Sequence, residues 1–390
     1  MAYAFSSLAA LAIILAAVLA LVWFTRLSAK RPNAMSCPDI TWSRMDTPAN
    51  PMMATAVMMF DEPLDFERLK QEIERRLLTF DRFRQRVIHD RGRHYWEDDP
   101  DFHIDFHVRR LRLPAGADQQ ALQELAGQLM SAPLDFARPL WEWYLVENYG
   151  QGCAVVFKAH HCIADGIALV RIFLAMSTPG SRGQQDYPEL AARAFRVTAA
   201  PQGPTRWLTA VRRGAAFLPA LAKQLLLGPD ARTILRGRVG GQKRAAWSLL
   251  LSLPELKRLG RQLGGQVNDV MLTAVAGALG RYLQDHGGGP APLAIRMIIP
   301  VSLRPFEPTI ELGNRFATVF LELPLGIQDP IERFYVICRR MNRIKRSREA
   351  AVNYAILHVM GLMPDRLEKL ALKFFGLKTT GSCQDSCRLS

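Results

Sequence analysis

Apolar residues recur along most of the chain at two spacings, and together these predict a mixed α/β protein. Runs of strand length predict strands over residues 54–60, 141–147, 153–159, 246–251, 293–301 and 317–323. Apolar residues three and four positions apart predict helices over residues 66–80, 121–130, 167–176, 253–263, 267–283 and 330–345. Asp65 and Asn268 are expected to cap the first and the fifth of these helices. Because strands and helices alternate in both halves, we expect mixed sheets covered by helices.

The stretch 101–109 alternates strictly between apolar and polar residues and predicts a half-buried strand. Its apolar face would carry Phe102, Ile104, Phe106 and Val108. Its other face would carry His103, Asp105 and His107. Side chains of these types can bind a metal ion. A solvated strand face is the preferred interpretation, and we expect no metal.

The N-terminus predicts a membrane anchor. Residues 2–25 carry no charge and form a run long enough to span a bilayer as a helix. Arg26, Lys30 and Arg31 follow directly, so the positive-inside rule places the rest of the chain in the cytoplasm. A cleaved signal peptide is the alternative, but it would have a basic start and a shorter apolar run. An uncleaved single-pass anchor, and therefore a membrane location, is expected.

The middle of the chain predicts a connection between two domains. Residues 177–205 are rich in Gly, Pro, Ser and Gln, which is typical of a crossover. Residues 207–227 are basic and apolar at helical spacing. This helix would either lie on a membrane or pack in the ordinary way, and the sequence leaves both open. The expected organisation is an anchor (1–31), an N-terminal domain (32–180), a crossover (181–243) and a C-terminal domain (244–390).

The composition narrows the choice of partner. The net charge of +14 and the pI of about 9.9 favour anionic partners such as acidic phospholipid or coenzyme A. Nucleic acid is not expected, because the basic residues are dispersed and neither a zinc-finger spacing nor an aromatic-basic RNA-binding signature is present. The six cysteines are scattered, without the density of a disulfide scaffold.

The strongest chemical motif is HHCIADG at residues 160–166, between a predicted strand and a predicted helix. An alcohol becomes a good nucleophile when a base takes its proton, and a histidine does this well near neutral pH. Adjacent residues of an extended segment point to opposite sides, so only one of the two histidines can face a substrate. Asp165 is better suited to an ion pair that supports the loop, and Gly166 allows a sharp turn. A nucleophilic Cys162 is conceivable but disfavoured.

Further segments match one known family in order and approximate spacing. They are PLWE at 139–142, NDV at 268–270, PVSLR at 300–304 and GN at 313–314. With HHCIADG, the sequence resembles the bacterial wax ester synthase/diacylglycerol acyltransferase family, a branch of the coenzyme A-dependent acyltransferases that include chloramphenicol acetyltransferase. The resemblance implies that His161 is the general base and that His160, Asp165 and Gly166 shape its loop. It also implies substrate-binding or supporting roles for Pro139, Leu140, Trp141, Asn268, Asp269, Ser302, Arg304 and Asn314.

The resemblance also implies the fold and the reaction. Two chloramphenicol-acetyltransferase-like α/β domains would enclose a tunnel at their interface. A long acyl group would pass from acyl-CoA, a substrate rather than a cofactor, to diacylglycerol or a fatty alcohol at a membrane or lipid-droplet surface. The polar tail at 378–390 departs from the family pattern, so an incomplete second domain with an open sheet edge is expected. Two alternatives stay open: a homologue that binds lipid without catalysis, and an acyltransferase with another acceptor.

Overall fold

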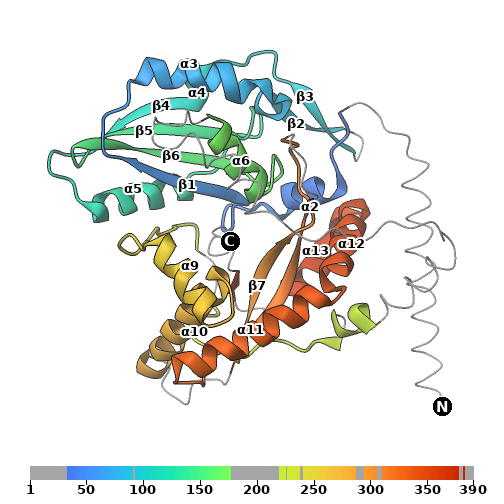
Figure 1. Ribbon diagram of the computed structural model, residues 1–390. Helices are drawn as coiled ribbons and strands as arrows, with labels where there is room; N and C mark the ends of the chain where they lie inside the picture. The colour runs from blue at the N-terminus through green and yellow to red at the C-terminus, as the bar shows by residue number, and fades with distance from the viewer. Residues whose placement is uncertain are drawn as a thin grey trace, which may run out of the picture.

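The computed structural model describes residues 33–90, 93–176, 219–224, 226–237, 240–286, 294–304, 310–376 and 381–382. Within these residues the chain forms two α/β halves, drawn one above the other in Figure 1. Each half has its own sheet, and parallel and antiparallel pairs occur in both sheets. The predicted α/β class with mixed sheets is therefore confirmed. The predicted boundaries at residues 31 and 180 lie outside the described residues, and the domain division stays a prediction.

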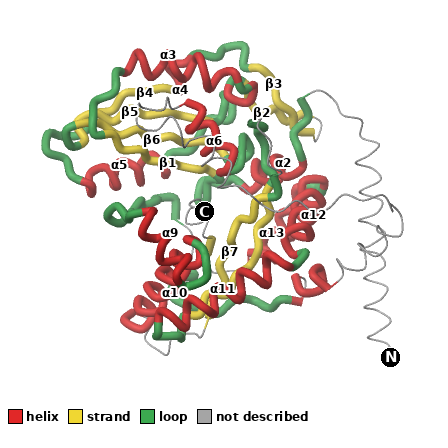
Figure 2. The backbone as a smooth tube through the Cα atoms, viewed as in Figure 1, coloured by secondary structure: helices red, strands yellow, loops and turns green. Residues whose placement is uncertain are grey.

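The first half is built on a four-stranded sheet in the order β1-β6-β5-β4. Its strands are β1 (Met53–Phe60), β4 (Val108–Arg112), β5 (Trp141–Tyr149) and β6 (Gly152–His160). Helices α3 (Phe66–Arg76) and α6 (Gly166–Met176) cover one face, and α5 (Gln119–Ser131) covers the other (Figures 1 and 2). Asp65 caps α3 as predicted, because its carboxylate accepts the backbone N–H of Arg68.

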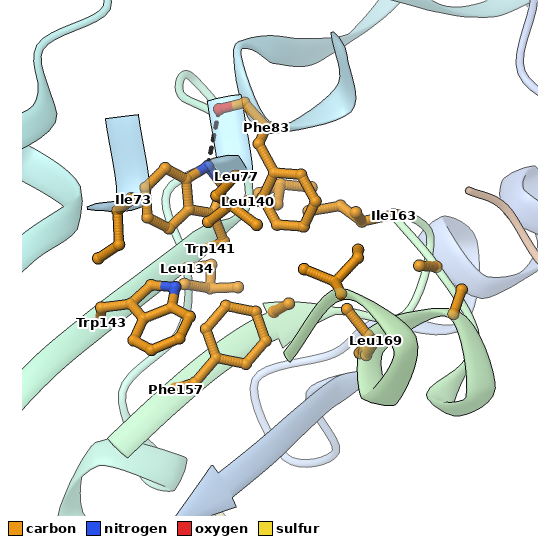
Figure 3. Close-up of a cluster of buried hydrophobic side chains, with 14 of the residues drawn as sticks. Ile73, Leu77, Phe83, Leu134, Leu140, Trp141, Trp143, Phe157, Ile163 and Leu169 are labelled. Carbon is orange, nitrogen blue, oxygen red and sulfur yellow. Dashed lines mark hydrogen bonds between the residues drawn. The ribbon is translucent and has the colours of Figure 1, made fainter. Parts of the chain in front are cut away.

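The core of the first half lies between its sheet and helices α3 and α6. Figure 3 shows Phe157 and Trp143 of the sheet packed near Leu169 of α6 and Ile73 of α3. Alternate residues of β6 point to this core and to the smaller cluster under α5, so all nine residues of β6 are buried. The strand therefore delivers the HHCIADG loop from a rigid support.

The smaller elements of the first half surround its sheet. Helix α2 (Cys37–Met45) precedes β1, and a hairpin is formed by β2 (Gln85–Asp90) and β3 (Arg93–Asp98). Two 3₁₀ turns, η1 (Leu77–Thr79) and η2 (Asp81–Phe83), follow α3.

The second half contains a three-stranded sheet in the order β8-β7-β9, formed by β7 (Ala294–Ser302), β8 (Phe316–Pro324) and β9 (Gly381–Ser382). Its helices are α9 (Leu253–Gln262), α10 (Val267–His286), α11 (Pro330–Arg346), α12 (Glu349–Leu362) and α13 (Asp365–Gly376). Helices α10 and α11 pack on the sheet face that carries Val319, Leu321 and Leu323. The opposite face carries Ile298, Thr318 and Phe320 and looks toward a cavity.

Helix α2 and helix α5 of the first half each form a seam with the second half. Helix α2 packs against α12, where the Thr41 hydroxyl donates to the Leu357 carbonyl at 3.2 Å. At the same seam a Cβ atom on Gly361 would overlap the carbonyl oxygen of Cys37, so glycine permits the close approach. The other seam runs along α5, whose Gln119 and Gln123 side chains donate to the Trp247 carbonyl.

Two predicted strands are wrong. Residues 101–109 form the single helical turn α4 (Ile104–His107) before β4 begins. Here His107 turns inward, stacks on Trp141 and places Nδ1 2.8 Å from the Trp141 carbonyl oxygen, while Phe106 is exposed. Residues 246–251 are irregular, because Trp247 packs on α5 and its carbonyl is bound by side chains instead of a neighbouring strand.

Two local predictions also need correction. Asn268 does not cap its helix, since α10 already begins at Val267 and the Asp269 carboxylate accepts the Gln266 backbone N–H at 2.8 Å. The tail at 378–390 was expected to leave an open sheet edge, but Gly381 and Ser382 pair in parallel with β7. The edge of β7 is thus covered at these two residues.

The predicted anchor at 1–31 and the crossover at 177–205 lie outside the described residues. Of the helix predicted over 207–227, residues 219–224 and 226 are described and helical, and residue 227 is described outside the helix. Among the helices within the described residues, none combines the length and the apolar character needed to cross a membrane.

Candidate active site

A cavity of about 510 Å³ lies between the two halves. The first half contributes residues of α2, β1 and the HHCIADG loop, and the second half contributes β7, β8, α12 and α13. The lining residues are Trp42, Met45, Asn50, Pro51, Met52, Met53, Thr55, Met130, His161, Gln224, Lys243, Ile298, Thr318, Phe320, Asn353, Ile356, Leu357, Met360 and Leu372. Five are methionines, whose unbranched side chains adapt to long apolar ligands.

Regular spacing explains why these residues share the cavity. On β1, Met53 and Thr55 lie two residues apart and so point to the same side. On α12, Asn353, Leu357 and Met360 lie on one face of the helix. The sheets of both halves and the helices α2, α5, α12 and α13 thereby enclose one mainly apolar space with a few polar groups, as is typical of a ligand site.

His161 is the one histidine among the cavity's described lining residues, and it is only 5% exposed. Its imidazole stacks on the Trp42 indole with ring centroids 4.8 Å apart, and the Phe316 ring lies 6.2 Å away. Its backbone N–H donates to the Met52 carbonyl at 2.8 Å, and its carbonyl accepts from the Asn314 side chain at 2.7 Å. The imidazole therefore packs against the Trp42–Phe316 pair, whose rings stack on each other, and hydrogen bonds fix the His161 backbone on both sides.

His160 has a different environment. Its Nδ1 accepts the Cys162 backbone N–H at 3.1 Å, and its ring meets the Phe136 ring edge to face. Burial, with a smaller contribution from neighbouring His161, lowers the pKa of His160 to about 3. His160 is thus a neutral residue that stabilises the turn, and it does not line the cavity. Of the two adjacent histidines, only His161 lines the cavity, as expected.

Asp165 forms a buried ion pair with the second half. Its Oδ2 lies 2.8 Å from Arg304 Nε and also accepts the Arg315 backbone N–H at 3.0 Å. Its Oδ1 accepts the Ala168 backbone N–H, near the start of α6 at Gly166. The Arg304 guanidinium also donates to the carbonyls of Glu311 and Gly313. Asp165 therefore joins the loop to both α6 and the second half.

The Gly313–Asn314 segment holds the same loop. We call the contacts that it makes, together with those of Asp165 and Arg304, the clamp. Gly313 has a φ of +95°, which favours glycine, and its N–H donates to the Ile163 carbonyl at 3.0 Å. A Cβ atom at Gly313 would also approach the Arg82 guanidinium to 3.2 Å. The Asn314 side chain donates both to the His161 carbonyl and to Asp39.

Asp39 and Arg82 are site residues that sequence reasoning missed. Asp39 is fully buried, and it accepts from Arg82 at 3.0 Å and from the Asn314 side chain at 2.7 Å. Arg82 donates further to the carbonyls of Cys162 and Ile163. A sequence signal for the start of a helix was present. Ser36, three residues before Asp39, forms the N-cap of α2, and Pro38 lies in the first turn.

The predicted substrate residues of the PLW segment do not line the cavity. Leu140 and Trp141 are fully buried in the core shown in Figure 3, where the Trp141 indole N–H donates to the Phe83 carbonyl. The Leu140 carbonyl accepts the His160 backbone N–H at 2.9 Å. Pro139 lies beside them and is also buried. The segment supports the start of the HHCIADG loop.

The second-half candidates are also absent from the cavity lining. The Ser302 hydroxyl accepts the Arg304 backbone N–H, so both residues belong to the clamp, together with Asn314. Asn268 and Asp269 lie in the first turn of α10. Burial, together with Asp269, raises the pKa of the Cys338 thiol to about 12. Direct contact of these residues with a substrate stays a prediction.

Two other candidates can be judged from geometry. Cys162 is fully buried, and this burial raises the pKa of its thiol far above the usual range, which opposes a nucleophilic role. His103, Asp105 and His107 do not share a strand face: Asp105 pairs with Lys70, and His107 is buried against Trp141. The described part of the chain contains no group of three or more His, Cys, Asp or Glu residues arranged to hold a metal ion.

Solved structures place this architecture in a known fold. The wax ester synthase/diacylglycerol acyltransferase from Marinobacter aquaeolei VT8 is similar, with a TM-score of 0.58 and 22% identity over 87% of this chain and 78% of that chain. The first condensation domain of the calcium-dependent antibiotic synthetase gives a TM-score of 0.54 and 17% identity over 91% of this chain and 80% of that chain. The fold is thus shared by acyltransferases and condensation domains.

Sequence comparison gives the family. The profile of the wax ester synthase/diacylglycerol acyltransferase catalytic domain matches residues 35–271, and that of the family's C-terminal domain matches residues 312–383. The Mycobacterium tuberculosis protein named diacylglycerol O-acyltransferase tgs1 is 27% identical over 77% of this chain and 68% of its own length. A second M. tuberculosis protein that carries the name diacylglycerol O-acyltransferase is 30% identical over 84% of this chain and 76% of its own length. The chain belongs to the wax ester synthase/diacylglycerol acyltransferase family and is an acyltransferase.

Proposed function

We propose that this enzyme transfers a long acyl chain from acyl-CoA to the hydroxyl group of diacylglycerol or of a long-chain alcohol, with His161 as general base. The observation that carries the proposal is the position of His161 on the wall of an apolar cavity to which both halves contribute. Such a space suits an acyl chain, and its volume of about 510 Å³ falls in the usual range of ligand pockets.

In the proposed reaction, an imidazole nitrogen of His161 takes the proton of the acceptor hydroxyl as its oxygen attacks the thioester carbonyl carbon. The tetrahedral intermediate then collapses: the carbon–sulfur bond breaks, and the imidazolium returns the proton to the departing thiolate. One ester and one free thiol result. The Trp42 stacking and the backbone hydrogen bonds of His161 support this role, because a general base must be held in a productive orientation.

Diacylglycerol is the acceptor that we place first. The curated relatives carry the name diacylglycerol O-acyltransferase. The cavity lining also includes polar residues such as Asn50, Thr55 and Thr318, which suit the ester groups of diacylglycerol beside its hydroxyl. A fatty alcohol offers only its hydroxyl group to these polar residues. Polar groups on the wall of a mainly apolar cavity favour a ligand that satisfies them.

We also propose that the enzyme works at the cytoplasmic side of a membrane. The uncharged run at 2–25 and the basic residues after it support this location, as do substrates that partition into lipid. The net charge of +14 favours both anionic head groups and the phosphates of CoA.

The test compares dioleoylglycerol and hexadecanol as acceptors for palmitoyl-CoA, following thiol release and lipid product in parallel. His161→Ala should lower ester formation about 10²–10⁴-fold. His286→Ala, a change at an exposed residue at the end of α10, is the matched control and should keep the parent rate. Product from hexadecanol alone would reassign the acceptor. Absence of either ester from folded protein would contradict the proposal.

A further inference from the structure

Helix α13 presents two leucines to solvent. Leu367 is 55% exposed and Leu370 is 66% exposed, and their spacing of three residues puts them on one side of the helix. Arg366 and Lys369 are exposed beside them. We call these four residues the outer face of α13. Apolar side chains flanked by basic ones are typical of a helix that lies in a membrane interface.

The opposite side of α13 belongs to the active-site cavity. Leu372 lines this cavity, and Glu368, one turn earlier, is buried in an ion pair with Arg44 of α2 at 3.0 Å. The same nitrogen of Arg44, Nη1, also donates to the Met363 carbonyl at 2.9 Å, at the corner between α12 and α13. The helix is therefore fixed to the first half and forms a thin wall with the cavity on one side and solvent on the other.

We propose that the outer face of α13 docks on a lipid surface that carries anionic head groups, so that the cavity lies next to the lipid phase. The leucines would enter the acyl region while Arg366 and Lys369 meet lipid phosphates. The inference rests on the proposed function in one respect: a water-insoluble acceptor must reach the cavity from lipid. Docking adds to that function the protein surface, the outer face of α13, through which the acceptor arrives.

A second group of exposed leucines lacks this relation to the cavity. Leu249 is 81% exposed and Leu250 is 92% exposed, in the irregular segment before α9. No residue from 244 to 262 lines the cavity. Helix α9 also lies on the other side of the second half from α13 in Figure 1. These leucines are therefore a matched control of equal chemistry at another place.

The first experiment measures hydrogen exchange of the full chain with phosphatidylcholine vesicles, with and without phosphatidylglycerol. Vesicles containing phosphatidylglycerol should slow exchange of the α13 amides, and high salt should reduce this protection. Leu367→Ser/Leu370→Ser should abolish it, and Arg366→Gln/Lys369→Gln should remove the preference for the anionic lipid. Leu249→Ser/Leu250→Ser should leave it intact. Protection confined to residues 249–262, or none at α13, would overturn the proposal.

The second experiment separates docking from catalysis. With the acceptor presented in anionic vesicles, Leu367→Ser/Leu370→Ser should lower the rate about tenfold or more. With a short, water-soluble alcohol as acceptor, the rate should equal that of the parent enzyme. An equal loss with both acceptors would contradict docking. Protection of α13 without ester formation by the parent enzyme would contradict the proposed function while leaving the docking surface in place.

Discussion

The central strands of the two halves differ in burial, and the difference separates their tasks. All nine residues of β6 are buried between two layers of helices, whereas only two of the nine residues of β7 are buried. Strand β6 ends at His160, directly before the proposed base, while one face of β7 looks into the cavity through Ile298. A group that must be positioned for chemistry benefits from rigid support. A surface that accepts long apolar chains has no such need, and it can stay less tightly packed.

The Asp165–Arg304 pair connects these two regions, and breaking it should have the largest effect. Arg304→Met would leave Asp165 buried without its cation, and removing one partner of a buried pair costs about 3–5 kcal/mol of folding free energy. We also expect ester formation to fall at least tenfold, because the loop that carries His161 loses its clamp. Chemical denaturation and the acyltransfer assay measure the two effects.

The exposed Glu311–Arg315 pair provides the control for this change. Both of its side chains are about half exposed, so Arg315→Gln should cost less than about 1 kcal/mol. An Arg304→Met enzyme that is as stable and active as Arg315→Gln would show that the clamp does not matter.

The aromatic contact of His161 gives the next largest effect. Trp42→Ala removes the stacked indole and opens a space beside the imidazole, which should cost about 3 kcal/mol in stability and lower kcat. Trp42→Phe keeps a ring against His161 and should retain most of the activity. Calorimetry and steady-state kinetics distinguish the variants. Equal kcat values for Ala and Phe would argue against a role for stacking in orienting the base.

A substitution in the α2–α12 seam should have a smaller effect than the changes at Arg304 and Trp42. Gly361→Ala places a methyl group against the Cys37 carbonyl, and the forced separation should cost about 1–3 kcal/mol. Because α2 carries Trp42 and Met45, the cavity should change shape, and KM for acyl-CoA should rise more than kcat falls. Gly228→Ala, where no atom lies within 4 Å of the added Cβ, is the control. An unchanged melting temperature for Gly361→Ala would mean that the seam opens freely.

The effect that is smallest at neutral pH comes from His160. Burial lowers the pKa of His160 to about 3, below the unfolded value of 6.5, so protonation favours the unfolded chain. Its contribution to stability is complete above pH 6.5 and is lost as the pH falls toward 3, by up to about 1.4 kcal/mol per pH unit. His160→Asn keeps an acceptor for the Cys162 N–H but cannot titrate. Denaturation between pH 6.5 and 4.5 should show a flatter profile for this variant, and parallel profiles would refute the assignment.

The sequence predicted the parts of the molecule that depend on neighbours along the chain. The apolar run of β6, the motif after it and the helix α6 follow one another directly, so periodicity and residue type were sufficient. The strand predicted over 101–109 failed because a buried histidine, His107, packs like an aromatic residue inside a helical turn. Periodicity treats histidine as polar and could not reveal this.

The clamp around the loop could not be predicted in the same way. Asp39, Arg82 and Asn314 come from three distant segments, and their roles arise only when the two halves meet. The PLW segment shows the opposite case, in which the sequence identified the residues but not their role. Its match to the family was clear, but only packing distinguishes a residue that supports the loop from one that touches the substrate, and Leu140 and Trp141 are buried in the core.

The central claim is that His161 acts as a base from the wall of the cavity, and chemical rescue tests it most directly. His161→Gly should form ester from palmitoyl-CoA and dioleoylglycerol at least about 10²-fold more slowly than the parent. Added imidazole can occupy the vacated space beside Trp42 and Phe316 and should restore part of the rate in a concentration-dependent manner. It should not restore Arg304→Met, which retains its histidine. A His161→Gly enzyme that works at the parent rate without imidazole would contradict the account.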